Sequence, residues 1–113
     1  MSMSVTINVM TDGSTVVSVR GEIDHSNAQE LHNAILRVVT QRRPGTLKVD
    51  LGLVTFLDSA AVGALVGAQR EAVGEGVRVV VDRASPFVHR QLQVAGVHGI
   101  LGAPGEDEVA HNR

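Results

Sequence analysis

The sequence contains no cysteine, tryptophan or tyrosine, and phenylalanine occurs only twice in 113 residues. Without cysteine the chain cannot form disulfides, thiolate zinc sites or a thiol nucleophile. With almost no aromatic residues it has no platform on which unpaired nucleobases could stack, and its formal net charge of −2 does not favour nucleic acid either. We therefore expect no direct binding of nucleic acid.

Long hydrophobic runs are also missing. No segment approaches the roughly 18 consecutive apolar residues of a membrane span, and the first ten residues do not combine a basic segment with an apolar one. We therefore expect a cytoplasmic protein that does not insert into a membrane. Hydrophobic residues still make up 43% of the chain and charged residues 19%, which is typical of one globular domain with an aliphatic core.

Hydrophobic periodicity predicts strands and helices along residues 1–102, in the order β-β-α-β-α-β-α-β. This order indicates a single α/β domain with a mixed sheet and flanking helices. Residues 103–113 are predicted to form a polar C-terminal tail with at most a turn or two of helix. The expected elements are two strands around the Asp12-Gly13 turn, a helix at 28–38 that stops at 43–45, a strand at 47–51, a loop up to Asp58, a helix from Ser59 to about 73, a strand at 77–81, a helix after Ser85-Pro86 and a short strand at 100–101.

The helix after Asp58 is rich in small residues. Asp58 and Ser59 are typical helix-capping residues, so the simplest interpretation of this stretch is a well-capped helix. The small residues form a smooth stripe, which suits either tight packing within the fold or close approach of another protein. The pattern predicts that Val62, Leu65, Val66 and Val73 face the sheet, whereas Ala60, Gly63, Ala64 and Gly67 form the small stripe.

Sequence patterns for catalysis are absent. Ser59 lacks the flanking glycines of a hydrolase nucleophile elbow, and no two of the five histidines have the i, i+4 spacing of a zinc-binding helix. Asp24 and Asp58 follow neighbouring strands and could form an acid pair or a magnesium site, but the sequence offers no third ligand. We therefore expect no enzymatic activity and no resident metal.

Four segments occur in an order and spacing that is informative as a set. They are GEID at 21–24, DLGLVTFLDSAAVGAL at 50–65, GEGVRVVVDRASPFVHRQL at 74–92 and VAGVHGIL at 94–101. Together they resemble the STAS domain family, which includes the bacterial anti-sigma factor antagonists. The resemblance implies a mixed sheet flanked by helices, with no cofactor and no catalysis. It also implies that the protein binds an anti-sigma factor that is itself a serine kinase. Binding frees a sigma factor, and phosphorylation of the antagonist ends the binding.

The family motif at the start of this helix reads Asp-Ser-Ser/Thr-Gly-Leu-Gly, and its second hydroxyl accepts the phosphate. Asp58, Ser59 and Gly63 match this motif, but Ala60 stands at the acceptor position and Ala61 replaces the next glycine. Alanine has no oxygen to phosphorylate. Either Ser59 is a displaced acceptor, or the kinase cannot switch this protein off. The resemblance implies a partner-binding face made of Asp24, Asp58, Ser59, Ala60, Ala61 and Gly63.

Two other functions within the same fold stay open at this point. The first is a STAS accessory subunit of a membrane transporter. The second is a sensor of a small ligand or nucleotide, with an anion at the helix starts near Asp58 and Ser85. The sequence also leaves open whether the chain forms a homodimer.

Overall fold

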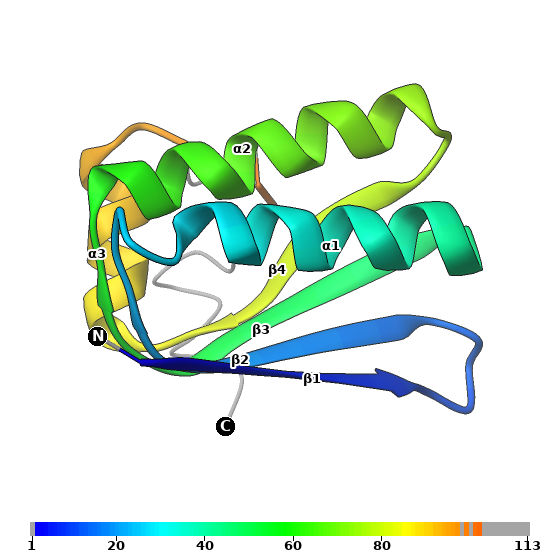
Figure 1. Cartoon of the computed structure of the whole chain (residues 1–113), viewed down its shortest axis with the longest axis horizontal. Helices are drawn as coiled ribbons and strands as arrows, with labels where there is room; N and C mark the ends of the chain where they lie inside the picture. The colour runs from blue at the N-terminus through cyan, green and yellow to red at the C-terminus, as the bar shows by residue number, and fades with distance from the viewer. Residues whose placement is uncertain (1, 98, 100, 103–113) are drawn as a thin grey trace.

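The structure is a computed structural model that describes residues 2–97, 99 and 101–102 (Figure 1). Its elements follow the predicted order as far as the third helix. The predicted tail at 103–113 lies outside the described residues, as does Ile100 of the predicted last strand, and Leu101 lies in a turn. The elements are β1 (Met3–Val9), β2 (Thr15–Ile23), α1 (Ala28–Arg42), β3 (Thr46–Leu57), α2 (Ser59–Gly74), β4 (Arg78–Ala84) and α3 (Pro86–Val94).

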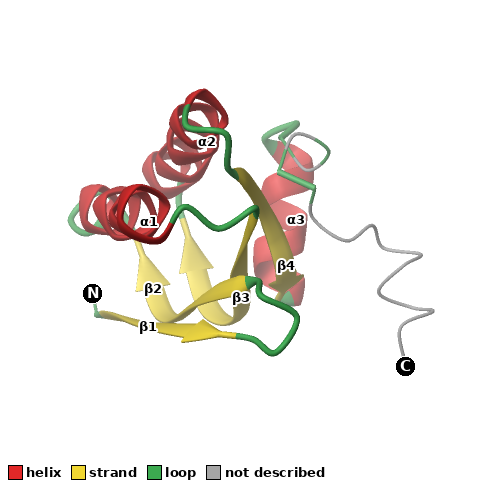
Figure 2. Cartoon of the chain, turned by 90° about the vertical axis from the view of Figure 1, so that its right-hand side faces the viewer, coloured by secondary structure: helices red, strands yellow, loops and turns green. Residues whose placement is uncertain are grey.

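The four strands form one mixed sheet in the order β1-β2-β3-β4. β1 and β2 are antiparallel because a tight turn joins them, whereas β2, β3 and β4 are parallel because α1 and α2 provide the crossovers. α1 and α2 lie side by side on one face of the sheet, and α3 packs beside β3 and β4 (Figure 2). The predicted mixed sheet with flanking helices is confirmed.

The hairpin turn between β1 and β2 depends on Asp12 and Gly13. Gly13 has a φ of +89°, which side-chain-bearing residues rarely adopt. The Asp12 carboxylate accepts hydrogen bonds from the Ser14 hydroxyl at 2.6 Å and from the Ser14 N–H at 2.9 Å. These bonds, the hydroxyl first, hold the pKa of Asp12 below its ordinary value. The predicted hairpin is therefore present and is fastened by its own turn residues.

The core lies between the sheet and the two helices α1 and α2, and it extends to the buried side chains of α3. Alternate residues of each strand point toward the helices, as expected for a sheet with one covered face. Each large side chain removed from water there contributes roughly 1.5–3 kcal/mol. The fully buried large side chains are Val17 and Ile23 of β2, Leu31, Ile35 and Val39 of α1, Leu47, Val49, Leu51, Val54 and Leu57 of β3, Leu65 of α2, Val88 and Leu92 of α3, and Leu101.

β3 is longer than predicted, and the expected loop before Asp58 is strand. The side chain of Leu53 is 61% exposed, so it interrupts the buried pattern that marks a strand in the sequence. A bulge lies at this point, where Gly52 N–H donates to the Asp50 carboxylate at 2.9 Å. Pairing with β4 ends at Leu51, but pairing with β2 continues to Leu57. Asp58 therefore lies beside the end of β2, one residue after the last paired residue of β3.

The prediction that Val73 faces the sheet is wrong, because its side chain is 59% exposed. Val62 and Leu65 are buried as predicted, and Val66 is half-buried. A helix turns 100° per residue, so a stripe at i, i+4, i+7 and i+11 stays on one face while the next residue turns away. The residues of α2 on that face are Ala61, Leu65, Ala68 and Ala72.

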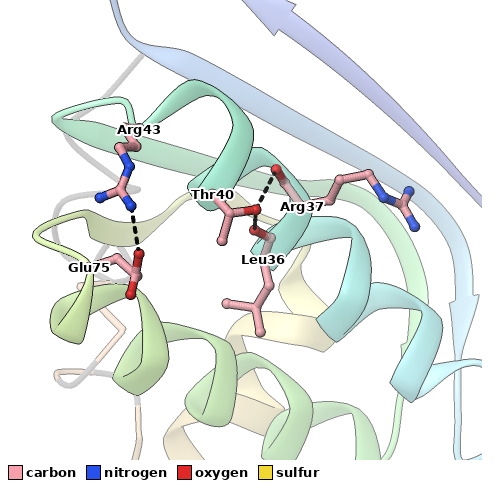
Figure 3. A network of polar contacts seen from close by, with 5 residues as sticks. All are labelled: Leu36, Arg37, Thr40, Arg43 and Glu75. Atoms are coloured by element: carbon pink, nitrogen blue, oxygen red, sulfur yellow. Dashed lines mark hydrogen bonds and ion pairs between the residues drawn. The ribbon is translucent and has the colours of Figure 1, made fainter.

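The C-terminal ends of α1 and α2 are joined by polar contacts (Figure 3). Arg43 ends α1 in the left-handed conformation, with a φ of +42°, which confirms the predicted stop. Its guanidinium lies 3.1 Å from the Glu75 carboxylate just after α2. Both side chains are largely exposed, so this ion pair contributes only about 0–1 kcal/mol.

Among the described residues, no helix has both the length and the apolar character needed to cross a bilayer.

Candidate functional site

The candidate site lies where β2 and β3 end and α1 and α2 begin. Asp58, the N-cap of α2, connects these segments through its backbone and its side chain. Its N–H donates to the Ile23 carbonyl at 3.2 Å. One carboxylate oxygen accepts from the Ala61 N–H at 2.9 Å, and the other accepts from the His25 N–H at 3.1 Å. The same carboxylate therefore caps α2 and fixes the loop between β2 and α1.

That loop is further fixed by Asp24 and Asn27. The Asp24 carboxylate accepts from the Ser26 hydroxyl at 2.5 Å and from the Ser26 N–H at 2.9 Å. These bonds, again the hydroxyl first, hold the pKa of Asp24 below its ordinary value. The buried Asn27 amide accepts from Asp24 N–H and donates to the Glu22 carbonyl, both at 2.9 Å. The polar groups of the loop are thus largely used to hold its own shape.

Asp24 and Asp58 reach the same corner, as their positions after neighbouring strands predict. The Asp58 carboxylate accepts from His25 and Ala61, whereas the Asp24 carboxylate accepts from Ser26, so the two carboxylates share no donor. In the described part of the chain, no group of three histidine or acidic side chains lies close enough together to hold a metal ion.

A groove of about 410 Å³ runs between α1 and α2 beside this corner. Its walls are small residues, and its edges are longer polar side chains. On one side it is bounded by His32, whose Nε2 lies 3.1 Å from the Glu71 carboxylate across the groove. The lining residues are His25, Ala28, Gln29 and His32 from the loop and α1, and Ala60, Gly63, Ala64 and Gly67 from α2.

Gly63 and Gly67 have different surroundings within this groove. A Cβ built on Gly63 meets no atom within 4 Å, so this position opens to solvent. A Cβ on Gly67 would lie 3.7 Å from the His32 ring, an ordinary packing distance. Near Gly63 another protein can therefore approach the α2 backbone, whereas Gly67 serves the contact between the two helices.

The structure brings most of the predicted site residues to one surface. Ser59, Ala60 and Gly63 are exposed there, and Asp24 and Asp58 are half-buried at its edge. Ala61 is different, because its side chain is fully buried under α2 and contributes only the N–H that Asp58 accepts. Ser85 lies apart from this groove at the start of α3, where its hydroxyl donates to the Val54 carbonyl at 2.6 Å.

Sequence reasoning missed the α1 side of the groove. His25, Gln29 and His32 look like ordinary solvent-facing residues when α1 is considered alone. Their role becomes visible only once α2 is known to lie beside α1. One signal was available: Gly67 and Ala64 mark the point at which α2 admits a close neighbour.

Known proteins share this fold and sequence pattern. Residues 8–102 match the protein family described as Mlab, STAS domain. The anti-sigma-F factor antagonist RsfB of Mycobacterium tuberculosis is 33% identical over 95 residues, which cover 83% of this chain and 76% of that protein. A STAS-domain containing protein of Pseudomonas aeruginosa is 32% identical over 95 residues, which cover 82% of this chain and 91% of that protein.

Solved structures give the same picture. An anti-sigma factor antagonist from Mycobacterium paratuberculosis matches with a TM-score of 0.77 and 30% identity, covering 98% of this chain and 93% of that one. The anti-sigma factor antagonist SpoIIAA in its unphosphorylated form matches with a TM-score of 0.72, covering 96% of this chain and 95% of that one. At 23% identity the second match concerns the fold alone.

Proposed function

Since this chain belongs to the STAS domain family, we propose that it is a protein-binding regulator of the anti-sigma factor antagonist type. It docks on an anti-sigma factor and thereby frees a sigma factor. Two similar proteins, at 33% and 30% identity, bear the name of anti-sigma factor antagonist. The protein acts by binding and not by catalysis, because the carboxylates of Asp24 and Asp58 are used to cap a helix and fix a loop.

The observation that carries this proposal is the exposed start of α2. Ser59, Ala60 and Gly63 present little more than backbone and short side chains there, beside the loop that contains Asp24. A surface of small residues lets a partner come within contact distance of the helix backbone. Asp58 and Ala61 support this contact surface from beneath, through the 2.9 Å capping bond.

We further propose that the partner is an anti-sigma factor of the serine kinase type, and that it cannot switch this protein off at position 60. Ala60 has no hydroxyl, so no phosphate can be attached at the position where the family motif carries its acceptor. The docked state therefore lasts until another process ends it. The outcome is a regulator whose binding depends on its amount and not on its phosphorylation.

Ser59 is a poor substitute acceptor for two physical reasons. Neighbouring side chains on a helix point about 100° apart, so a kinase that reads position 60 would have to shift its substrate. A phosphate of charge about −1.5 to −2 on Ser59 would also stand next to the Asp58 carboxylate, and like charges repel. The helix dipole favours an anion at this end, but by only roughly 0.3–1 kcal/mol.

The test is to isolate the tagged protein from its native cells and identify its partners and any phosphate on Ser59 by mass spectrometry. We expect an ATP-binding anti-sigma factor and unmodified Ser59. In parallel, Gly63→Arg should reduce recovery of that partner by about tenfold or more, because a long charged side chain fills the contact surface. Gly74→Arg is the matched control, because its Cβ position near the other end of α2 is equally open.

Three results would contradict the proposal. Equal recovery of the partner with Gly63→Arg and Gly74→Arg would show that the start of α2 is not the contact surface. Recovery of transporter subunits in place of an anti-sigma factor would assign the chain to the other function that the sequence left open. A phosphate on Ser59 would show that the switch has moved by one residue.

A further inference from the structure

β1 has one edge that bonds to β2 and one edge that bonds to nothing in the part of the chain that the structure describes. At one end Glu22 N–H donates to the Ser2 carbonyl at 2.9 Å, and at the other Met10 N–H donates to the Ser14 carbonyl at 2.8 Å. In an antiparallel strand the backbone groups alternate between the two edges. Even-numbered residues of 2–10 therefore bond β2, and the odd-numbered residues 3–9 direct their N–H and C=O groups outward.

This free edge lacks the features that usually prevent strands from pairing with other chains. Edge strands are commonly protected by charged residues, proline or a bulge. Residues 1–11 contain no charged residue and no proline, and β1 pairs with β2 without a register shift. The side chains of Ile7 and Val9 are also 41% and 59% exposed. The edge is thus flat, uncharged and partly apolar.

The opposite edge of the sheet is different. On β4, Val81 N–H already donates to the Leu101 carbonyl at 2.9 Å. β4 also carries the exposed charged residues Arg78, Asp82 and Arg83. One edge of the sheet is therefore protected by charge and by a chain segment, and the other is open.

α1 adds a charge pattern beside the open edge. A hollow of about 450 Å³ between β1 and α1 is lined by Val5 and Ile7 below and by α1 above, with Glu30 near its start and Arg37 near its end. The two charged residues are seven positions apart, which is about two helical turns. The Arg37 side chain extends away from Glu75 and α2 (Figure 3). An acidic and a basic group thus flank one hollow, which Asn33 and Ala34 also line.

We propose that β1 pairs with β1 of a second copy of this chain, antiparallel, around a two-fold axis at Thr6. In this register Thr6 lies opposite the second copy's Thr6, and Val5 lies opposite the second copy's Ile7. The outward groups of Val5 and Ile7 then form hydrogen-bonded pairs, while the Thr6 pair lies between them without backbone bonds. The two four-stranded sheets join into one continuous sheet, and the pairing closes at two copies because it is isologous.

The charges on α1 favour this antiparallel arrangement. α1 and β1 run in the same direction along the sheet (Figure 1), so a two-fold axis at Thr6 reverses both in the second copy. Glu30 of each copy then comes toward Arg37 of the other, across the hollow beside β1. A parallel pairing would need a two-fold axis along the strands, which would place the two α1 helices on opposite faces of the joined sheet and keep Glu30 and Arg37 apart. Opposite charges that meet reciprocally select the register and the direction.

Cysteine cross-linking tests the register directly, because the chain has no cysteine of its own. Thr6→Cys places its thiols opposite each other in a pair without backbone bonds, where Cα atoms lie about 4.5 Å apart, within disulfide range. Ser4→Cys is the matched control: it is exposed on the same face of β1, yet in this register it faces Asn8 of the second copy. Under mild oxidation Thr6→Cys should form a covalent dimer at least about tenfold faster. Equal rates for the two variants would overturn the proposal.

Sedimentation over a range of protein concentrations tests the dimer without cross-linking. Ile7→Lys should abolish self-association, whereas Val73→Lys, at an exposed valine of α2, should leave it unchanged. Glu30→Arg should weaken the dimer by about tenfold, and adding Arg37→Glu should restore it, because each copy again presents one group of each sign. A monomer at all concentrations, or a double variant no better than the single one, would refute this arrangement.

Discussion

The start of α2 and the edge of β1 differ in what happens to their backbone polar groups. At the start of α2 and in the loop beside it, Asp58 and Asn27 form hydrogen bonds with backbone groups that the ends of the strands and helices leave without a partner. At the edge of β1, the odd-numbered residues 3–9 direct their N–H and C=O groups outward without a partner among the described residues. A surface whose backbone groups are already hydrogen-bonded can select a partner only by shape and side-chain chemistry. An open strand edge can pair with any suitable extended strand. The two regions therefore suit two kinds of binding.

Gly21→Ala should have the largest effect, and it acts on the β1 side of the comparison. Gly21 has a φ of +104°, and a Cβ there would collide with the Ser2 carbonyl oxygen. We expect a loss of about 2–4 kcal/mol in the free energy of unfolding, measured by urea denaturation. Gly13→Ala, at a φ of +89° but with no atom within 4 Å, should cost only about 1 kcal/mol. Equal losses would show that the close approach of Ser2 is unimportant.

Asp58→Ala should have the next largest effect, and it acts on the α2 side. The substitution removes the cap of α2, about 0.5–2 kcal/mol, and a hydrogen bond to the loop, about 0.5–1.5 kcal/mol. Urea denaturation should therefore show a loss of roughly 1–3 kcal/mol. The exposed Asp82 on β4 offers the control, because Asp82→Ala should stay within about 0.5 kcal/mol. A loss no greater than this control would mean that the bonds of Asp58 contribute little.

Ala60→Ser should change regulation with almost no change in stability. The side chain is exposed, so we expect the free energy of unfolding to stay within about 0.5 kcal/mol. The new hydroxyl restores the acceptor of the family motif, so the purified anti-sigma kinase and ATP should phosphorylate this variant and release it. Ala64→Ser, one turn later in the groove, should stay unmodified. Mass spectrometry measures the phosphate transferred to each variant. The absence of phosphate on Ala60→Ser would count against the proposed partner.

Ser26→Ala should have the smallest effect, a loss of stability that is present above the ordinary pKa of Asp24 and disappears in acid. The pKa of Asp24 is lowered in the folded protein, chiefly by the Ser26 hydroxyl, so this bond stabilises the fold above the ordinary pKa of 3.8 and the benefit is lost as the pH falls through the folded pKa. Ser26→Ala should raise the pKa of Asp24 toward 3.8 in a carboxyl NMR titration. Asp12, bonded to Ser14 in the same way, is an internal reference that should not move. A shift of both groups would indicate a global change.

Most of the fold was predictable from local patterns. Asp12-Gly13 marks the hairpin because glycine tolerates its positive φ, and Arg43-Pro44-Gly45 marks the end of α1 because proline cannot continue a helix. The error at β3 has a different origin. The strand beyond Leu51 is paired on one side only and exposes Leu53, so its sequence does not alternate as a buried strand does.

The candidate site was predictable only in part, because it combines two helices. Asp58 and Ser59 indicate the start of a helix because both residue types favour the N-cap. The small residues that follow indicate that another segment or protein can approach the helix closely. Whether a small residue faces outward or inward depends on packing: Ala60 is exposed, whereas Ala61 is buried one position later. His25 and His32 join the site through the contact between α1 and α2, which no local pattern reports.

The carboxylate of Asp58 also sets what binding costs. It links residues 33 positions apart, since it holds both the His25 N–H and the first turn of α2. A loop held in this way has little conformational freedom left to lose when a partner arrives, so the entropy of ordering is small. The backbone of this surface should therefore move little between the free and the bound protein. The aspartate that caps α2 thus also preorganises the surface above it for the proposed partner.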